Sequence, residues 1–295
     1  MRFAIIGAAG YIAPRHMQAI VETGHEIALA CDTRDSVGVL DRWAPECTFV
    51  RDTKLFFEIC RESEYPPIDA VVICTPNYMH VTHACQAMAA GCDVVIEKPL
   101  CVPGENDPDV GDLIKSAAEH GRIVYPVVQL RHHPEVEAWA DRYVFSMPGV
   151  VSDVWRPNRS VEIDYAVWRG PWYDCSWKAD RNRSGGLLLN LGVHLFDLCN
   201  HLFGDLVEVC EAFGNDYQAQ GVNRHQRATV TWRLRRDSRT PRRVFRIDGY
   251  EIDMTTAITK LHHAVYREVA QGHFWDLEDV ARSIDVVKAI EEAMR

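Results

Sequence analysis

Two segments of the sequence carry side chains that could act together on an alcohol. One is a Glu-Lys-Pro tripeptide that contains Lys98, and the other carries Asn190, His194 and Asp197. On a helix these last three occupy positions i, i+4 and i+7, so they share one face. Oxidising a secondary alcohol needs a base for the hydroxyl proton and a positive charge beside the oxygen while hydride leaves the carbon. Lys98 and His194 could supply both, whereas the alternatives are an ordinary surface lysine and a solvated polar stripe.

A glycine-containing loop near the start of the chain could bind the dinucleotide that accepts the hydride. The segment Gly7-Ala8-Ala9-Gly10-Tyr11-Ile12-Ala13 follows an apolar strand pattern and opens a helical one, which is the context that such loops require. Gly7 permits the tight turn, Gly10 lets a pyrophosphate approach the backbone, and the anion would lie at the helix N-terminus. Ala9 replaces the usual middle glycine. The alternative is a glycine-rich turn that binds nothing.

Asp32 bears on the choice between NAD and NADP. It ends the second strand pattern, where a carboxylate can accept hydrogen bonds from the adenosine ribose hydroxyls. A 2′-phosphate would meet this negative charge, which favours NAD, although Arg34 keeps NADP open. A turn cap is the alternative role for Asp32.

The elements that must position these residues alternate between strands and helices over the first ~130 residues, which predicts a parallel sheet built from βαβ units. Ligands in such sheets bind at the carboxyl ends of the strands, which is where Lys98 falls, and Pro99 allows a cis Lys98–Pro99 bond. Asp52 is expected to cap a helix. Six strands are expected, at residues 3–6, 26–31, 47–50, 70–74, 93–96 and 123–128.

From about residue 150 the pattern changes to antiparallel strands with one long helix among them. Asp248-Gly249 predicts a two-residue hairpin between strands at 243–247 and 250–254, and residues 281–294 predict a terminal amphipathic helix. The expected fold class is α/β, with a Rossmann domain at 1–130 and an α+β domain, built on a mostly antiparallel sheet, at 131–295. Residues 227–235 alternate, so we expect one face of that strand to be buried through Ala228, Val230, Trp232 and Leu234.

Composition excludes several other classes of protein. Hydrophobic residues make up 47% of the 295 positions and charged residues 25%, which is typical of soluble globular proteins, and no apolar run reaches the ~20 residues of a membrane span. The formal charge of −10 disfavours nucleic acid. The ten cysteines lack metal-type spacing, so we expect free thiols in a reducing cytoplasm. We expect no export signal and no metal site, including at the histidine pairs 132–133 and 262–263.

The chain resembles the Gfo/Idh/MocA oxidoreductase family along its whole length. Members join a Rossmann domain with Glu-Lys-Pro to a C-terminal α/β domain with the pattern G-G-x-x-x-D-x-G-x-H-x-x-D, which residues 185–197 match apart from Asn190. Thr75-Pro76-Asn77 with His80, and Trp177-Lys178, match positions that line the cofactor in the family. Asn190 stands where most members have a catalytic aspartate, and an amide cannot take a proton.

Within the family, residues 7–17, 130–133, 172–178 and 190–194 resemble the WlbA/WbpB-type UDP-N-acetylglucosaminuronate 3-dehydrogenases, in which asparagine already precedes the histidine. This resemblance implies NAD-dependent oxidation of the sugar C3 hydroxyl in lipopolysaccharide and other cell-surface polysaccharide biosynthesis. It also implies reoxidation of bound NADH by a 2-oxo acid and a homotetramer formed through the open sheet of the second domain. A polyol or monosaccharide dehydrogenase and a catalytically inactive NAD-binding sensor are the alternatives.

The hypothesis assigns a role to each group: Lys98 stabilises the alkoxide, His194 accepts the proton, Asn190 orients the hydroxyl and Asp197 orients His194. The residues expected to bind the cofactor are Gly7, Ala9, Gly10, Tyr11, Ile12, Asp32, Thr75, Asn77, His80, Glu97, Lys98, Gln129, Trp177 and Lys178. The carboxylate and pyrophosphate of a nucleotide-sugar uronate call for cationic and polar partners. The candidates are Arg15, Arg131, Arg159, Arg169 and Tyr173, beside Asn190 and His194. Each arginine could instead be an ordinary surface charge.

Overall fold

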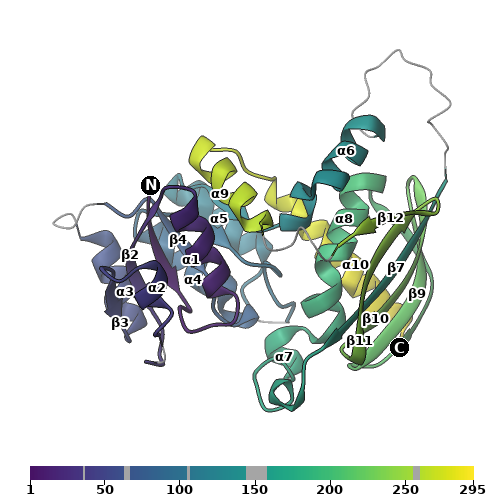
Figure 1. Ribbon diagram of the computed structural model, residues 1–295, viewed down its shortest axis with the longest axis horizontal. Helices are drawn as coiled ribbons and strands as arrows, with labels where there is room; N and C mark the ends of the chain where they lie inside the picture. The colour runs from purple at the N-terminus through teal and green to yellow at the C-terminus, as the bar shows by residue number, and fades with distance from the viewer. Residues whose placement is uncertain (36, 63–66, 105–106, 144–157, 255–259) are drawn as a thin grey trace. The chain divides into compact units, whose positions relative to one another are not determined.

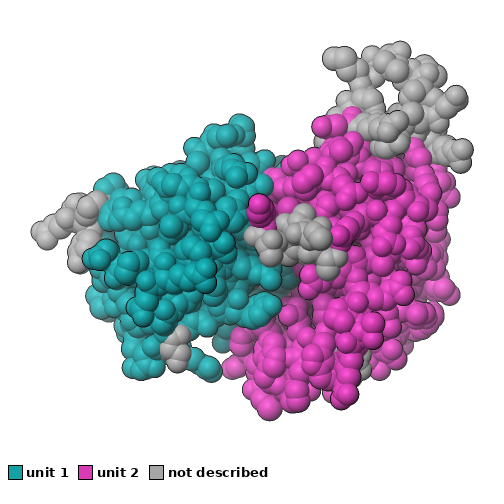
Figure 2. All heavy atoms as spheres, in the orientation of Figure 1, with its two compact units in different colours: residues 1–127, 262–278 teal, residues 128–261, 279–295 magenta. Residues whose placement is uncertain are grey.

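The computed structural model describes residues 1–35, 37–62, 67–104, 107–143, 158–254 and 260–295, and the chain divides into two compact units. The first unit comprises residues 1–127 and 262–278, and the second comprises 128–261 and 279–295, as Figure 2 shows by colour. The sequence predicted a break after residue 130 followed by a continuous second domain. The structure differs in that residues 262–278 return to the first unit.

The first unit is built on a six-stranded parallel sheet in the order β3-β2-β1-β4-β5-β6. Strands β2, β3 and β4 of this sheet are labelled in Figure 1. The central strands are apolar on both faces, as buried parallel strands are. The six predicted strands are confirmed, and the chain order reverses between β1 and β4, where ligands bind in sheets of this type. The strands are β1 (Arg2–Ile6), β2 (Glu26–Cys31), β3 (Thr48–Val50), β4 (Ala70–Ile73), β5 (Asp93–Ile96) and β6 (Val124–Pro126).

Helices pack against this sheet, and one of them comes from the returning segment. Phe3 and Ile5 of β1 lie in a buried cluster with Met17 of α1 and Tyr266 of α9, so the returning helix completes the same apolar face as the first helix. Asp52 caps α3 as predicted, because its side chain accepts a hydrogen bond from the Leu55 amide. The helices are α1 (Ala13–Glu22), α2 (Leu40–Trp43), α3 (Thr53–Arg61), α4 (His80–Ala89), α5 (Val110–His120) and α9 (Leu261–Gln271), with a 3-10 turn η1 (Asn77–Met79).

The second unit is built on a six-stranded mixed sheet in the order β12-β11-β7-β10-β9-β8. Its neighbouring strands are antiparallel except for β7 and β10, which are parallel, so the mostly antiparallel sheet that the sequence predicted is confirmed. Asp248 and Gly249 have φ angles of 48° and 87°, as a tight hairpin turn between β11 and β12 requires. The strands are β7 (Arg159–Trp168), β8 (Leu206–Gly214), β9 (Gln218–His225), β10 (Ala228–Arg235), β11 (Asp237–Ile247) and β12 (Tyr250–Asp253).

One face of this second sheet is covered by helix α8. The predicted alternation along β10 is confirmed, because Trp232 and its apolar neighbours are buried, and the Trp232 ring meets Phe196 of α8 edge-on with centroids 5.6 Å apart. On the opposite face Thr231 and Arg233 are exposed. The helices of this unit are α6 (Pro134–Tyr143), α7 (Arg181–Ser184), α8 (Val193–Phe203) and α10 (Leu277–Ala293), with short turns η2 (Gln129–His132), η3 (Pro171–Tyr173) and η4 (Leu188–Gly192).

Two general expectations bear on the rest of the chain. All ten cysteines lie among the described residues and are free thiols, as their spacing predicted. None of the helices in the described part of the chain combines the length and the apolarity that crossing a bilayer would take.

Candidate functional site

The glycine loop lies at the carboxyl end of β1, against the ends of β2 and β4. The amides of Gly7 and Ala8 donate to the carbonyl of Cys31, the last residue of β2. Gly7 has a φ angle of +87°, and a Cβ atom there would lie 2.5 Å from the carbonyl oxygen of Cys74. A glycine is therefore required at this position, for the backbone conformation and for close packing on β4.

Gly10 is also crowded, but by the loop itself. A Cβ atom at Gly10 would lie 2.9 Å from the carbonyl oxygen of Gly7 and 3.3 Å from that of Cys74. Helix α1 then begins without a side-chain cap among the described residues, with Pro14 in its first turn and Tyr11 64% exposed. Backbone amides at such an uncapped helix start are suited to bind an anion such as a pyrophosphate.

Asp32 follows β2 and holds the loop in place. Its two carboxylate oxygens accept hydrogen bonds from the backbone amides of Ala9, at 3.0 Å, and Arg34, at 2.9 Å. The turn-capping role that the sequence left open is therefore filled. Each carboxylate oxygen has a second lone pair, so the same geometry allows Asp32 to accept from a ribose hydroxyl.

The segment after β4 is fastened to the Lys98 turn through His80. The His80 ring is buried, with Nδ1 2.7 Å from the carbonyl oxygen of Pro99 and Nε2 2.9 Å from that of Thr75. Burial lowers the pKa of this imidazole despite both carbonyls. His80 thus joins two loops, and the contact with cofactor that the resemblance implied stays a prediction. Asn77 is likewise buried, in η1.

Lys98 follows β5, and the Lys98–Pro99 peptide bond is cis, as the sequence allowed. Glu97 was expected to contact the cofactor. Its side chain lies in the interior, 5% exposed, where one oxygen accepts from the Lys98 backbone amide at 3.1 Å, and its part in cofactor binding stays a prediction. Lys98 itself is half-buried, at the same edge of the sheet as Gly7, Asp32 and Thr75.

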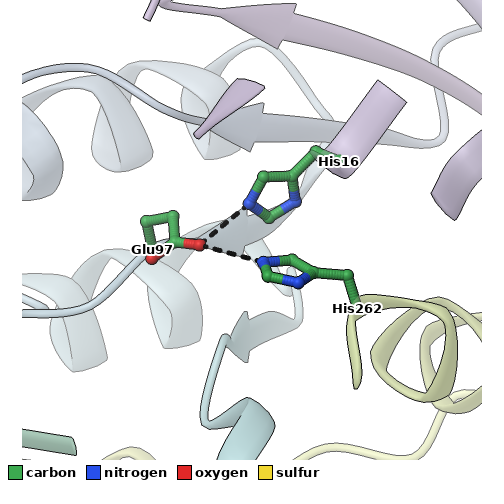
Figure 3. A group of neighbouring side chains, drawn as sticks. All are labelled: His16, Glu97 and His262. Carbon is green, nitrogen blue, oxygen red and sulfur yellow. Dashed lines mark hydrogen bonds and ion pairs between the residues drawn. The ribbon is translucent and has the colours of Figure 1, made fainter. Parts of the chain in front are cut away.

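A buried histidine, carboxylate and histidine lie behind this turn (Figure 3). Nε2 of His16 on α1 is 2.9 Å from Oε1 of Glu97, and Nε2 of His262 on α9 is 3.5 Å from the same oxygen. The hydroxyl of Tyr266 lies 2.8 Å from Nδ1 of His16. Burial raises the pKa of the Glu97 carboxyl, but the two histidines outweigh it and hold the pKa well below the ordinary value.

The sequence analysis missed this group, although one signal was present. His16 falls on the apolar face of α1, between Ala13, Met17 and Ile20, and a polar residue on such a face needs a partner. His262 and Tyr266 lie near the end of the chain, and only the return of α9 brings them to β5. The two adjacent pairs of histidines diverge instead, since His263 pairs with Glu22 and His133 with the Asp253 carbonyl.

In the second unit, Asn190 and His194 lie where a π-helical turn meets an α-helix. Residues 188–192 form the π turn η4, and α8 begins at Val193. The sequence predicted a regular helix with both residues on one face. A π turn is wider than an α turn, so it shifts Asn190 relative to His194, and such turns often occur at functional sites. Both side chains are partly exposed.

Asn190 is oriented by Tyr173. The Asn190 amide nitrogen donates to the Tyr173 hydroxyl oxygen at 2.8 Å, and burial raises the pKa of Tyr173, so the phenol keeps its proton at neutral pH. The guanidinium of Arg236 lies over the Tyr173 ring, 4.7 Å from its centroid, and over the Tyr217 ring at 4.2 Å. Sequence reasoning included Tyr173 but missed Arg236. Arg236 lies between β10 and β11, and only the folded sheet brings it to Tyr173.

Two of the predicted anion-binding arginines have other partners. Arg131 is fully buried, forms two hydrogen bonds to Asp197 at 2.7 and 3.0 Å, and bonds Asp279 at 2.9 Å. Arg131 is therefore an interior residue that holds the Asp197 carboxylate, while its role toward an anion and the role of Asp197 toward His194 stay predictions. Arg159 bonds Asp248 beside the β11–β12 hairpin, at 2.7 Å.

Arg15 and Arg169 remain as candidates. Arg15 is partly exposed on α1, and Arg169 follows β7 and lies near enough to Tyr173 to affect its pKa. Arg159 begins β7, so about 30 Å separates it from Arg169 at the usual rise per residue. Arg159 and Arg169 therefore cannot contact one small ligand together.

Three residues that the resemblance assigned to the cofactor lie in the second unit. Lys178 stacks its ammonium over the Trp177 ring, 4.2 Å from the centroid, and both side chains are partly exposed. Gln129, in η2, is buried. Their part in cofactor binding stays a prediction.

Two family models match the chain. Residues 1–127 match the NAD-binding Rossmann fold of an oxidoreductase family, Gfo/Idh/MocA, and residues 159–272 match the C-terminal alpha/beta domain of the same family. Among curated proteins, a scyllo-inositol 2-dehydrogenase (NADP(+)) from Bacillus subtilis is 25% identical over 52% of this chain and 40% of that protein. The chain spans roughly half or less of the length of the first curated relatives that it matches.

Solved structures of the WlbA (WbpB) dehydrogenase from Thermus thermophilus are similar over nearly the whole chain. One, in complex with NAD and α-ketoglutarate, is 32% identical over 96% of this chain and 92% of that chain, with a TM-score of 0.85. The other, in complex with NAD and UDP-GlcNAcA, is 31% identical over 100% of this chain and 95% of that chain, with a TM-score of 0.87. Because the two family models span the sheets of both units and most of the sequence, the chain belongs to the Gfo/Idh/MocA oxidoreductase family.

Proposed function

We propose that this protein is an NAD-dependent dehydrogenase that oxidises the C3 hydroxyl of UDP-N-acetylglucosaminuronic acid to the 3-keto sugar, in cell-surface polysaccharide biosynthesis. One observation carries the proposal. The Thermus thermophilus dehydrogenase, 31% identical over the full length of this chain, has been solved in complex with NAD and UDP-GlcNAcA. The glycine loop, the Lys98 turn and the Asn190–His194 segment supply groups that this chemistry needs.

The first unit fits NAD on its own geometry. The uncapped start of α1 suits the pyrophosphate, and the carboxylate of Asp32 suits a ribose with free hydroxyls better than a 2′-phosphate. Arg34 is exposed beside Asp32, so a measured preference for NADP would revise this part of the proposal. When bound, NAD supplies the carbon that accepts the hydride.

Four side chains have proposed roles. The O–H proton of the substrate passes to the His194 imidazole, the C–H hydrogen leaves as hydride, and the carbon becomes a ketone. The Lys98 ammonium stabilises the negative charge that develops on the oxygen. Asn190 positions the hydroxyl as a hydrogen-bonding partner, since its amide cannot accept the proton, and Tyr173 holds Asn190.

Ligand-dependent stability tests the substrate class. A ligand that binds only the folded chain raises the melting temperature. At a ligand concentration of a hundred times its Kd, the free energy of unfolding increases by about 2.7 kcal/mol. We expect UDP and UDP-N-acetylglucosaminuronic acid to stabilise the protein, and inositol and glucose to leave the midpoint unchanged. Stabilisation by inositol but not by UDP would instead assign a polyol substrate.

The spectrum of the purified protein tests the redox cycle. We expect NADH to remain bound after purification and its near-ultraviolet absorbance to be discharged by 2-oxoglutarate. Turnover of the nucleotide sugar should then require a 2-oxo acid. A protein that binds NAD but oxidises neither the nucleotide sugar nor a polyol would support the sensor alternative. Sedimentation analysis tests the homotetramer that forms part of the same proposal.

A further inference from the structure

A chain of buried hydrogen bonds joins helix α9, helix α1 and the Lys98 turn. The Tyr266 hydroxyl lies 2.8 Å from Nδ1 of His16, Nε2 of His16 lies 2.9 Å from Oε1 of Glu97, and the Lys98 amide donates to Oε2 of Glu97 at 3.1 Å. Tyr266 and His16 are fully buried and Glu97 is nearly so. The chain therefore begins in the returning segment and ends at the backbone of the candidate catalytic lysine.

The direction of each hydrogen bond follows from the protonation of the two residues at the ends of the chain, Tyr266 and Glu97. Burial raises the pKa of Tyr266 well above its ordinary value, so its hydroxyl is protonated and donates to Nδ1 of His16. The pKa of Glu97 lies well below its ordinary value, so its oxygens only accept. The His16 proton is then on Nε2, which donates to Glu97. Each of these polar atoms has a partner of the correct kind.

His262 lies against the acidic end of this chain. Its ring is 1% exposed, stands edge-on to the His16 ring with centroids 4.8 Å apart, and places Nε2 3.5 Å from Oε1 of Glu97. Nδ1 of this ring has no hydrogen-bond partner among the described residues. Burial is the main reason that the pKa of His262 is lowered.

We propose that Glu97, His16 and Tyr266 are positioning residues that hold Lys98 in the orientation that its chemistry needs. A buried ionised carboxylate is costly, and an apolar residue of similar size would stabilise a core as well or better. Glu97 has a use that an apolar residue lacks, because it anchors the Lys98 amide. His80 holds the other side of the same turn through the Pro99 carbonyl at 2.7 Å. The inference rests on the proposed function only for the role of Lys98 in turnover.

The same atoms could instead hold a divalent metal ion. The three candidate ligand atoms of His16, Glu97 and His262 lie within 4.8 Å of one another, and two histidines with one carboxylate are a common ligand set. A metal on His16 Nε2 would displace the proton that completes the hydrogen bond to Glu97. Because the chain from Tyr266 to the Lys98 amide is complete with that proton in place, the geometry favours the hydrogen-bonded arrangement.

Four variants and one matched control test the proposal. Glu97→Gln replaces one of the two acceptor oxygens with an amide donor, so either the His16 N–H or the Lys98 amide loses its acceptor, and Tyr266→Phe removes the donor to Nδ1. Tyr125→Phe is the control, since Tyr125 is a buried tyrosine of the same sheet whose ring packs on Phe274. His16→Gln keeps a donor that can reach Glu97, whereas His16→Leu does not, so this pair shows whether the donor matters.

The first readout does not depend on the substrate. The purified full chain is treated with a limiting amount of acetic anhydride, and acylation of Lys98 is measured by peptide mass spectrometry. We expect Glu97→Gln and Tyr266→Phe to raise the acylation rate of Lys98 several-fold, because the turn is less constrained, and Tyr125→Phe to leave it unchanged. With the nucleotide sugar, both variants should lower kcat up to about 100-fold while the KM for NAD changes little.

Three results would overturn the proposal. One is unchanged Lys98 acylation and kcat in folded Glu97→Gln and Tyr266→Phe, and another is the same rise in Lys98 acylation and the same fall in kcat in Tyr125→Phe. The third is one equivalent of a transition metal in the purified protein that is lost in His262→Leu, which would make the group a metal site. If the wild-type chain fails to oxidise the nucleotide sugar, the proposed function fails, while the acylation of Lys98 still decides the positioning role.

Discussion

Nε2 of His16 and Oε1 of Glu97 lie 2.9 Å apart, although 81 positions separate the two residues in the chain. His16 belongs to the helix that follows the glycine loop, and Glu97 precedes Lys98. One buried hydrogen bond therefore joins the element suited to the pyrophosphate to the turn that carries the lysine. Lys98, His194 and the glycine loop take no side-chain part in this hydrogen bond. Variants of these residues should therefore separate effects on the reaction from effects on NAD binding.

Lys98→Met removes the ammonium and keeps most of the aliphatic length. Without a cation beside the developing alkoxide, kcat should fall about 1,000-fold. His194→Asn should cause a loss of similar size, because an amide cannot accept the proton. NAD binding, measured by calorimetry, should stay close to that of the wild type in both. Near-normal turnover in either variant would contradict the assigned roles.

Gly7→Ala tests the packing of the glycine loop on β4. The new Cβ would lie 2.5 Å from the Cys74 carbonyl oxygen, and the φ angle of +87° disfavours it as well. We expect the free energy of unfolding to fall by about 3 kcal/mol or more, with loss of NAD binding.

Gly24→Ala is the matched control for this substitution. Gly24 has a φ angle of +83°, but a Cβ there meets nothing within 4 Å. Only the conformational cost of about 1 kcal/mol should appear in chemical denaturation. An equal loss of stability in Gly7→Ala and Gly24→Ala would show that the backbone near Cys74 moves to accept the new Cβ at no cost in free energy.

Local patterns predicted most of the fold. The apolar runs of the parallel sheet, the alternation along β10 and the Asp248-Gly249 hairpin depend on neighbouring residues, and the structure confirms all of them. The return of residues 262–278 to the first unit could not be predicted in this way. It depends on which apolar face of the sheet remains uncovered, and that is a property of the assembled unit rather than of any one segment.

In the candidate site, too, features set by local sequence could be predicted and contacts between distant residues could not. Gly7, Asp32 and Lys98 follow strands, so their position at one edge of the sheet could be predicted from strand order. The partners of Glu97 and Arg131 could not be, because a charged residue in a sequence does not reveal which distant charge it meets in the interior. His16 to Glu97, at 2.9 Å, and Arg131 to Asp197, at 2.7 Å, are both contacts of this kind.

The stability of the protein should fall as the pH is lowered from about 6.5 to 4. Burial is the main reason that the pKa values of His83 and His132 are lowered to about 4, from an ordinary value of 6.5. The unfolded chain therefore takes up these protons first. The stability that each neutral ring contributes is complete above pH 6.5 and is lost towards pH 4, by up to about 3 kcal/mol for each histidine.

Thermal unfolding of His83→Gln across this range checks the assignment. The melting temperature of this variant should depend less on pH than that of the wild type. His120→Gln, at an exposed position, should keep the wild-type dependence. An identical slope in all three proteins would assign the acid sensitivity to other groups.

Arg131→Met tests the interior role of this arginine. Removing the guanidinium leaves the buried Asp197 carboxylate without its two hydrogen bonds, which should lower the free energy of unfolding by about 3–5 kcal/mol. Arg159→Met removes an ion pair to the partly exposed Asp248 and should cost about 1 kcal/mol or less. If Arg131→Met folded with wild-type stability but lost affinity for UDP, the original anion-binding assignment would be restored.

Asn190 stands where the family resemblance implies an aspartate, and its variants separate orientation from proton transfer. Asn190→Leu removes the donor to the Tyr173 hydroxyl and the polar group that would position the substrate, so kcat should fall about 10- to 100-fold with little change in the KM for NAD. Asn190→Asp keeps the shape and should stay within about tenfold of the wild type, because His194 remains the base. Its pH–rate profile should gain an acidic limb, since the protonated acid is a weaker acceptor than the ionised carboxylate for the Tyr173 hydroxyl. If Asn190→Leu turned over normally while Tyr173→Phe did not, the tyrosine would bind the substrate directly, and the bond between the two side chains would serve only to hold the π turn.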